Sequence, residues 1–162
     1  IDVQKAFFER DPTTVRSLED AVEYINAAIE LFREQDLPVV SIQHKNEESG
    51  LIPGSPGFEM HEGIDFEPSD LRIVKTYGNS FNKTGLAEKL RAVGVDTVII
   101  TGFCAEYCIL STCRGAQDYD FTSIILRSSL ASGIPERIRF VEDISETITY
   151  GALKAFLDLS HD

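Results

Sequence analysis

Short apolar segments alternate with helical segments along the whole chain, and this order constrains the fold most. Apolar runs typical of buried strands are found at residues 1–3, 37–43, 71–75, 95–101 and 121–127. Helices are expected at residues 18–35, 85–94, 105–119, 135–144 and 147–159. Strands that alternate with helices form a parallel sheet covered on both faces. The sequence therefore predicts a three-layer α/β/α, Rossmann-like fold with a mostly parallel sheet.

The boundaries of the first elements follow from local signals. The residues "IDV" are typical of the end of a strand, so we expect this strand to begin upstream of Ile1. Ser17 and Asp20 resemble a capping box, which predicts that the first long helix begins beside Leu18. No composition change or linker divides the 162 residues. We therefore expect a single domain over residues 1–162.

A long connection of residues 44–68 interrupts the alternation. It is rich in Gly, Pro and Ser and shows no periodicity. Connections of this length are usually functional, so we expect a lid that shapes a pocket or contacts a second subunit. Glu59, Met60 and His61 lie near its centre and are candidates for contact with a substrate or partner.

The net charge of −12 and the pI of about 4.6 limit the kinds of partner. An acidic surface repels nucleic acid and anionic membranes, and no apolar run approaches the length of a membrane span. Three cysteines cannot form a fully paired disulfide framework. These features predict a reduced, cytoplasmic protein whose partner is a small-molecule substrate, with no nucleic acid and no membrane.

Several polar residues stand at the ends of the predicted strands. In open parallel sheets the ligand site lies at the carboxyl ends of the strands. This rule selects Asp2, Gln43, His44, Lys75 and the segment after Thr101 as candidate site residues.

All three cysteines lie in one segment, "TGFCAEYCILSTC" (Thr101–Cys113). A structural zinc site needs four ligands, and a redox pair usually has the spacing C-x-x-C; neither is present. Cys108 follows a strand, a glycine and a helix start, where backbone N–H groups lack intrahelical acceptors. This position favours a nucleophilic thiol, and a buried structural thiol is the alternative. Cys113 shares a face with apolar residues and is expected in the core.

A cysteine nucleophile needs a base or a cation to act near neutral pH. Asp2 and Lys75 end other strands and supply these two groups. Each alone is more often a turn or surface residue, but together with Cys108 they form an Asp–Lys–Cys constellation. We expect Lys75 and the helix start to lower the pKa of the Cys108 thiol.

The segments around these residues resemble the isochorismatase-like cysteine hydrolase family. The stretch "IDVQKAFF" resembles its Asp motif, and "VKTYGNSFNKTGLAEKLRAVGVDTVIITGFCAEYC" resembles its Lys motif continuing into its Cys motif. The resemblance implies Asp2 as general base, Lys75 as charge stabiliser and Cys108 as nucleophile. It also implies a cis peptide before Cys104 and an oxyanion hole made by the N–H groups of Cys104 and Cys108. A homodimer or homotetramer is implied as well.

Aromatic residues near the motifs are candidates for the substrate-binding wall. They are Phe7, Phe8, Phe81 and Tyr107, with His44 as a further wall residue. For each aromatic residue the alternative is an ordinary place in the core.

One departure from the family pattern bears on metal binding. Nicotinamidases of the family carry an Asp-x-His metal motif after the second strand, where this chain has Ile42. An isoleucine side chain cannot ligate a metal, so no metal and no cofactor are expected. The resulting interpretation is a metal-independent hydrolase of an amide or related C–N bond that works through a thioester. The alternatives are an isochorismatase-type ether hydrolase and a non-catalytic binding or regulatory module.

The sequence predicts unequal reactivity of the thiols. Cys108 should alkylate at neutral pH much faster than Cys113, because only Cys108 is expected in an open cleft beside a lysine. Peptide mapping after brief iodoacetamide treatment of the folded protein measures this. Equal labelling of the two cysteines would rule out the nucleophile assignment.

Overall fold

The apolar runs of the sequence form parallel strands in the computed structural model, which describes residues 1–159. The strands are β1 (Val40–His44), β2 (Leu71–Lys75), β3 (Thr97–Phe103), β4 (Thr122–Ala131) and β5 (Thr147–Ile148). One group has the order β1-β2 and the other the order β3-β4-β5. Every pairing between these strands is parallel, as the alternation of strands and helices predicts.

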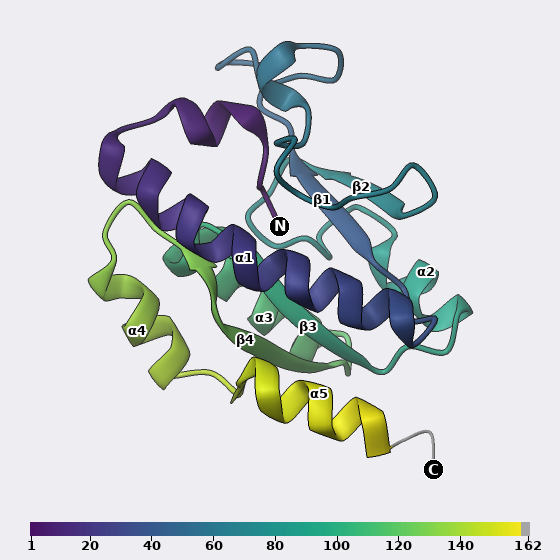
Figure 1. Ribbon diagram of the computed structural model, residues 1–162. Coiled ribbons are helices and arrows are strands. Elements are labelled where there is room, and N and C mark those ends of the chain that lie inside the picture. Colours follow the sequence, from purple (N-terminus) through teal and green to yellow (C-terminus); the bar gives the residue numbers. More distant parts are fainter. Residues whose placement is uncertain (160–162) are drawn as a thin grey trace.

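The N-terminal segment lies between the two groups of strands (Figure 1). The Asp2 N–H donates to the carbonyl of Ile42 in β1, at 2.9 Å. On the other side, the Phe103 N–H of β3 donates to the carbonyl of Ile1, also at 2.9 Å. Residues 1–2 therefore connect β1 to β3. Residues 1–3 were predicted as a strand but form none, because Asp2 has a positive φ of 53°.

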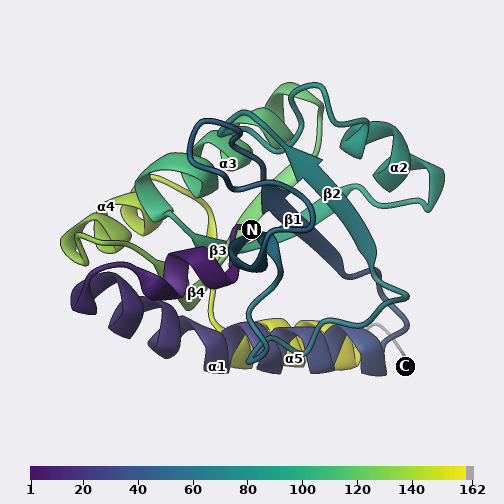
Figure 2. The same cartoon turned by 90° about the horizontal axis from the view of Figure 1, so that it is seen from above.

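Helices cover both faces of this sheet. They are α1 (Pro12–Glu34), α2 (Leu86–Ala92), α3 (Leu110–Asp118), α4 (Glu136–Asp143) and α5 (Tyr150–Leu159). Figure 2 shows α1 and α5 on one side, with α2, α3 and α4 on the other. Leu31 of α1 and Leu153 of α5 pack on Leu126 of β4, while Cys113 and Val141 pack on the opposite face. The three-layer α/β/α prediction is confirmed.

The first helix begins earlier than the capping-box pattern suggested. Asp11 is its N-cap, and the Asp11 carboxylate accepts from the N–H groups of Thr13 and Thr14. Pro12 occupies the first turn, where its missing N–H costs nothing. Ser17 instead lies inside the helix, buried, and its hydroxyl accepts from the Ser132 N–H at 3.0 Å. Asp11 followed by Pro12 was therefore a stronger signal for the helix start than the pair of Ser17 and Asp20.

Three shorter elements complete the chain. The 3-10 turns η1 (Lys5–Glu9) and η2 (Pro56–Phe58) lie side by side, and a π-helical turn, η3 (Ala105–Ile109), precedes α3. The two residues of β5 were expected inside the last helix; they pair with β4 instead. Among residues 1–159, no helix is long and apolar enough to cross a membrane.

The connection between β1 and β2 is held against the N-terminal segment. Met60 forms an isolated antiparallel bridge with Gln4, and the His61 N–H donates to the Val3 carbonyl at 3.0 Å. Phe58 is buried in the core. The middle of the connection therefore packs as part of the fold, and a lid function stays a prediction.

Gly102 is required where β3 passes the N-terminal segment. Its φ is +115°, and a Cβ there would overlap the Ile1 carbonyl oxygen. Gly102→Ala should lower the free energy of unfolding by roughly 3 kcal/mol, because backbone strain and a clash add. Gly94→Ala is the matched control: its φ is +77° with open space around it, so only roughly 1 kcal/mol is expected. Urea unfolding measures both, and equal losses would contradict this account.

Candidate active site

Lys75 ends β2 and lies beside His44, the last residue of β1. The parallel register pairs these two residues directly. Lys75 is one of the most buried residues of the chain, with 1% of its surface exposed. A buried ammonium is stable only when partners surround it. Its Nζ lies 2.9 Å from Asp2 Oδ2, 3.1 Å from His44 Nδ1 and 3.2 Å from Cys108 Sγ.

Asp2 is held by the strands on each side of it. Its backbone has a positive φ of 53° and its side chain is buried. One carboxylate oxygen, Oδ2, accepts from Lys75, while Oδ1 has no hydrogen-bond partner among the described residues. A buried carboxylate oxygen without a donor is unusual. It leaves an acceptor free for a proton from a neighbouring group.

Cys108 lies in the π-helical turn that follows β3. The chain turns sharply after Gly102, and the Phe103–Cys104 peptide is cis, as the family resemblance implied. The turn then brings Cys108 back beside Lys75. Its thiol is half-buried, whereas Cys113 is 1% exposed. The sequence prediction that Cys113 belongs to the core is confirmed.

The prediction of a lowered pKa for the Cys108 thiol was wrong. Burial and then the Asp2 carboxylate raise this pKa to about 11, although the Lys75 ammonium acts in the opposite direction. The resting thiol is therefore protonated at neutral pH. Reaction at Cys108 requires a base that removes the proton as the sulfur attacks, and the unequal alkylation predicted above depends on access rather than on thiolate content.

Cys104 belongs to a separate group of contacts. Its thiol donates to a Glu106 carboxylate oxygen at 3.0 Å, and the same oxygen accepts from Ser132 Oγ at 2.8 Å. Arg137 binds the other oxygen of Glu106 at 3.1 Å. Burial and the neighbouring Glu106 raise the pKa of Cys104 to about 12. Its sulfur is therefore inert, and among the residues described no hydrogen bond uses the Cys104 backbone N–H.

Three side chains of the site carry atoms that can ligate a metal. They belong to Asp2, His44 and Cys108, and lie within 4.8 Å of one another. The Lys75 ammonium lies within 3.2 Å of all three, in the space that a metal ion would need. The donor set thus already surrounds a cation. His61 lies apart from it: its ring stacks on Phe8, and its Nδ1 accepts from the Gly63 N–H.

The predicted aromatic wall is only partly in place. Phe7 is 7% exposed and contacts Phe103, and Phe81 is 3% exposed and contacts Phe121. Both are buried in the core, which is the alternative that the sequence left open for each of them. An aromatic residue next to a motif reaches the core as readily as the site. Phe8 stays partly buried against His61, and Tyr107 is exposed.

Sequence reasoning missed Gln4, which is fully buried. Its side-chain amide donates to the carbonyls of His44 and Phe58, both at 3.0 Å, and accepts from the His44 N–H at 2.8 Å. The amide thereby fixes the backbone at the end of β1. No periodic signal in the sequence could have found it, because Asp2 has a positive φ and the segment forms no strand.

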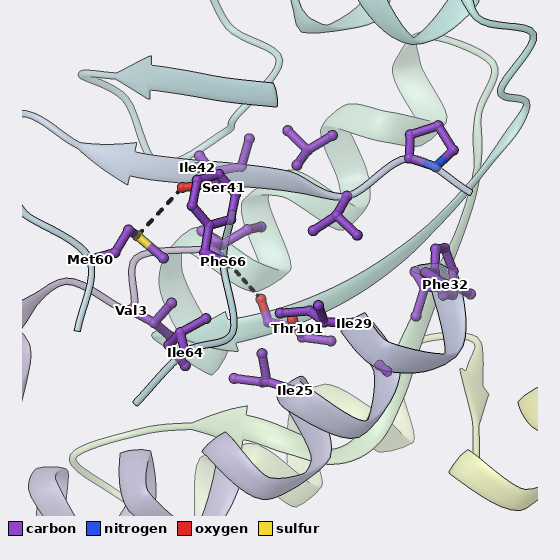
Figure 3. Close-up of a pocket in the computed structure, with 16 residues that line it drawn as sticks. Val3, Ile25, Ile29, Phe32, Ser41, Ile42, Met60, Ile64, Phe66 and Thr101 are labelled. Carbon is purple, nitrogen blue, oxygen red and sulfur yellow. Dashed lines mark hydrogen bonds between the residues drawn. The ribbon is translucent and has the colours of Figure 1, made fainter. Parts of the chain in front are cut away.

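An apolar pocket lies between α1, β1 and the N-terminal segment (Figure 3). Val3, Ile25, Ile42 and Phe66 are among its lining residues. Met60, a candidate for substrate contact, is among the lining residues, but Asp2, His44, Lys75 and Cys108 are not. The lining side chains offer no nucleophile, acid or base beyond hydroxyls and a thioether. The candidate active site is therefore the group around Lys75.

Known proteins resemble this chain in sequence. The family model for the isochorismatase domain matches residues 1–140. The uncharacterized isochorismatase family protein YrdC of Bacillus subtilis (strain 168) is 31% identical over 134 residues, covering 82% of this chain and 71% of YrdC. Maleamate amidohydrolase of Pseudomonas putida is 30% identical over 77 residues, covering 48% of this chain and 36% of that protein.

A solved structure shows the same fold. The crystal structure of an isochorismatase family protein from Desulfovibrio vulgaris superposes with a TM-score of 0.86 at 19% identity. The match covers 97% of this chain and 95% of that chain. With the family model spanning most of its length, the chain belongs to the isochorismatase family, whose members include amide hydrolases.

Proposed function

We propose that the chain is a cysteine hydrolase that cleaves a small-molecule amide or a related C–N bond through a thioester on Cys108. The observation that carries this proposal is the buried ammonium of Lys75, which contacts both Asp2 and Cys108. The unpartnered Oδ1 of Asp2 adds a free acceptor in the same site. The similarity to maleamate amidohydrolase supports an amide as the substrate class.

The first half-reaction forms the thioester. Asp2 takes the proton from the Cys108 thiol as the sulfur attacks the carbonyl carbon of the amide. The tetrahedral intermediate then collapses, the C–N bond breaks, and Asp2 returns the proton to the leaving nitrogen. A base is needed because the pKa of Cys108 is raised to about 11. Lys75 holds the Asp2 carboxylate in place through the contact at 2.9 Å.

The second half-reaction releases the acid. Asp2 removes a proton from water as the water oxygen attacks the thioester carbon. The C–S bond breaks, and the proton returns to Cys108. In both steps, the backbone N–H groups of Cys104 and Cys108 are proposed to donate to the oxyanion. Such donors are usually the largest contribution to acyl transfer.

Two further parts of the proposal rest on the sequence: the family resemblance supports an oligomer, and the odd number of cysteines supports a reducing compartment. The protein is proposed to act as a homodimer or homotetramer, and to act in the cytoplasm. Light scattering at micromolar concentration measures the first. A clean monomer would remove it without affecting the chemistry.

An amide library screened for ammonia release tests the reaction, with Cys108→Ala as the blank. For any amide that is cleaved, Asp2→Asn, Lys75→Met and Cys108→Ala should each lower kcat/KM by at least about 100-fold. Cys113→Ala is the matched control: it also removes a thiol, but one in the core, and should retain activity within a few-fold. Circular dichroism must show each variant folded. Full activity of folded Cys108→Ala would overturn the thioester.

Metal removal should have little effect on this reaction. Lys75 supplies the positive charge within the set of Asp2, His44 and Cys108 donors. Prolonged EDTA treatment should therefore leave the rate of amide cleavage within about twofold, and added zinc should not raise it. Loss of activity on chelation that zinc restores would contradict the proposed site.

A further inference from the structure

We propose that His44 is a specificity-determining residue: its ring is fixed with the proton on Nε2, and this N–H selects amides that carry a hydrogen-bond acceptor near the scissile carbonyl. The inference rests on the proposed hydrolase function for its substrate class. The tautomer itself follows from geometry.

Lys75 determines which ring nitrogen carries the proton. A lysine ammonium has three N–H donors and no acceptor. Its three close contacts are Asp2 Oδ2, Cys108 Sγ and His44 Nδ1, at 2.9, 3.2 and 3.1 Å. His44 Nδ1 must therefore offer its lone pair. A neutral imidazole with an unprotonated Nδ1 carries its proton on Nε2.

The ring stays neutral because a second positive charge is unfavourable there. Burial and then the Lys75 ammonium hold the pKa of His44 below its ordinary value. Around the ring, Lys75 and Asp2 balance one another and Cys108 is a neutral thiol at pH 7. The site thus offers a neutral donor, which fits a carbonyl or ether oxygen.

The backbone of His44 is fixed as firmly as its ring. Gln4 accepts from the His44 N–H and donates to the His44 carbonyl. Strand pairing with Lys75 adds a constraint from the other side. A donor that is already oriented loses little entropy when it binds a ligand, so it discriminates well between an acceptor and a methylene group.

The partial burial of His44 is consistent with contact to a substrate. Asp2 and Lys75 are buried, whereas His44 and Cys108 are half-buried. A substrate at the Cys108 sulfur lies near His44, because both side chains contact the same Lys75 ammonium. The Nε2 atom is the ring nitrogen that does not contact Lys75, and no hydrogen bond among the described residues uses it.

The tautomer is measured directly by long-range 1H–15N correlation on histidine-labelled protein at pH 7. We expect His44 to show a protonated Nε2 and an unprotonated Nδ1, with its signals assigned by their loss in His44→Gln. In Lys75→Met, which removes the donor, this fixed pattern should be lost. A protonated Nδ1 or an imidazolium in the wild-type protein would overturn the proposal.

Recognition is measured with probes that differ in one group. Methoxyacetamide and acetoacetamide each carry an acceptor where butyramide has a methylene. In the Cys108→Ala protein, the first two probes at millimolar concentration should shift the His44 Nε2–H signal, and butyramide should not. Equal shifts with all three probes, or no shift with any of them, would overturn acceptor selection.

Measurements of turnover distinguish a failure of the His44 proposal from a failure of the proposed hydrolase function. The ratio of kcat/KM for methoxyacetamide over butyramide should fall at least roughly fivefold in His44→Phe, which keeps a ring but has no donor. His44→Gln, which keeps an N–H near the Nε2 position, should retain most of the ratio. An unchanged ratio in His44→Phe would defeat only the role of His44. Selective binding without ammonia release from any amide would instead defeat the hydrolase.

Discussion

The buried ion pair of Lys75 and Asp2 is the interaction on which the site depends. Both side chains are almost fully removed from water, so each charge needs the other. Removing one partner of such a pair typically costs about 3–5 kcal/mol. Because Asp2 belongs to the N-terminal segment and Lys75 to β2, the pair ties together parts of the chain that are 73 residues apart. Cys108 and His44 then take the two remaining N–H donors of Lys75.

This arrangement explains how a protonated thiol can serve as a nucleophile. Many reactive cysteines rest as thiolates, but here burial and Asp2 oppose ionisation of Cys108. The same carboxylate that raises the pKa of the thiol is placed to receive its proton. In the proposed reaction, charge therefore develops on sulfur only as a bond to carbon forms. A thiol of this kind is also a poor target for oxidants, which react with thiolates.

The order of strands and helices predicted the three-layer fold, because the hydrophobic periodicity that identifies each element depends only on neighbouring residues. The strand-end rule selected Asp2, Lys75 and His44, which the structure brings together around Cys108. The thiol pKa was misjudged, since burial depends on distant segments. The burial of Phe7 and Phe81 could not be decided from the sequence for the same reason. Contacts made by Gln4 with two separate segments also leave no periodic trace in the sequence.

The contacts of Gln4 determine which parts of the chain can change in length. Its amide, together with that of Gln43, binds the Phe58 carbonyl and so anchors the connection between β1 and β2 there, next to the backbone contacts of Met60 and His61. The stretches on either side of Phe58 can gain or lose residues while the anchor keeps the end of β1 in register, because lengthening a surface loop changes its closure entropy only slowly. The connection can thus change in length without disturbing the contacts at the end of β1.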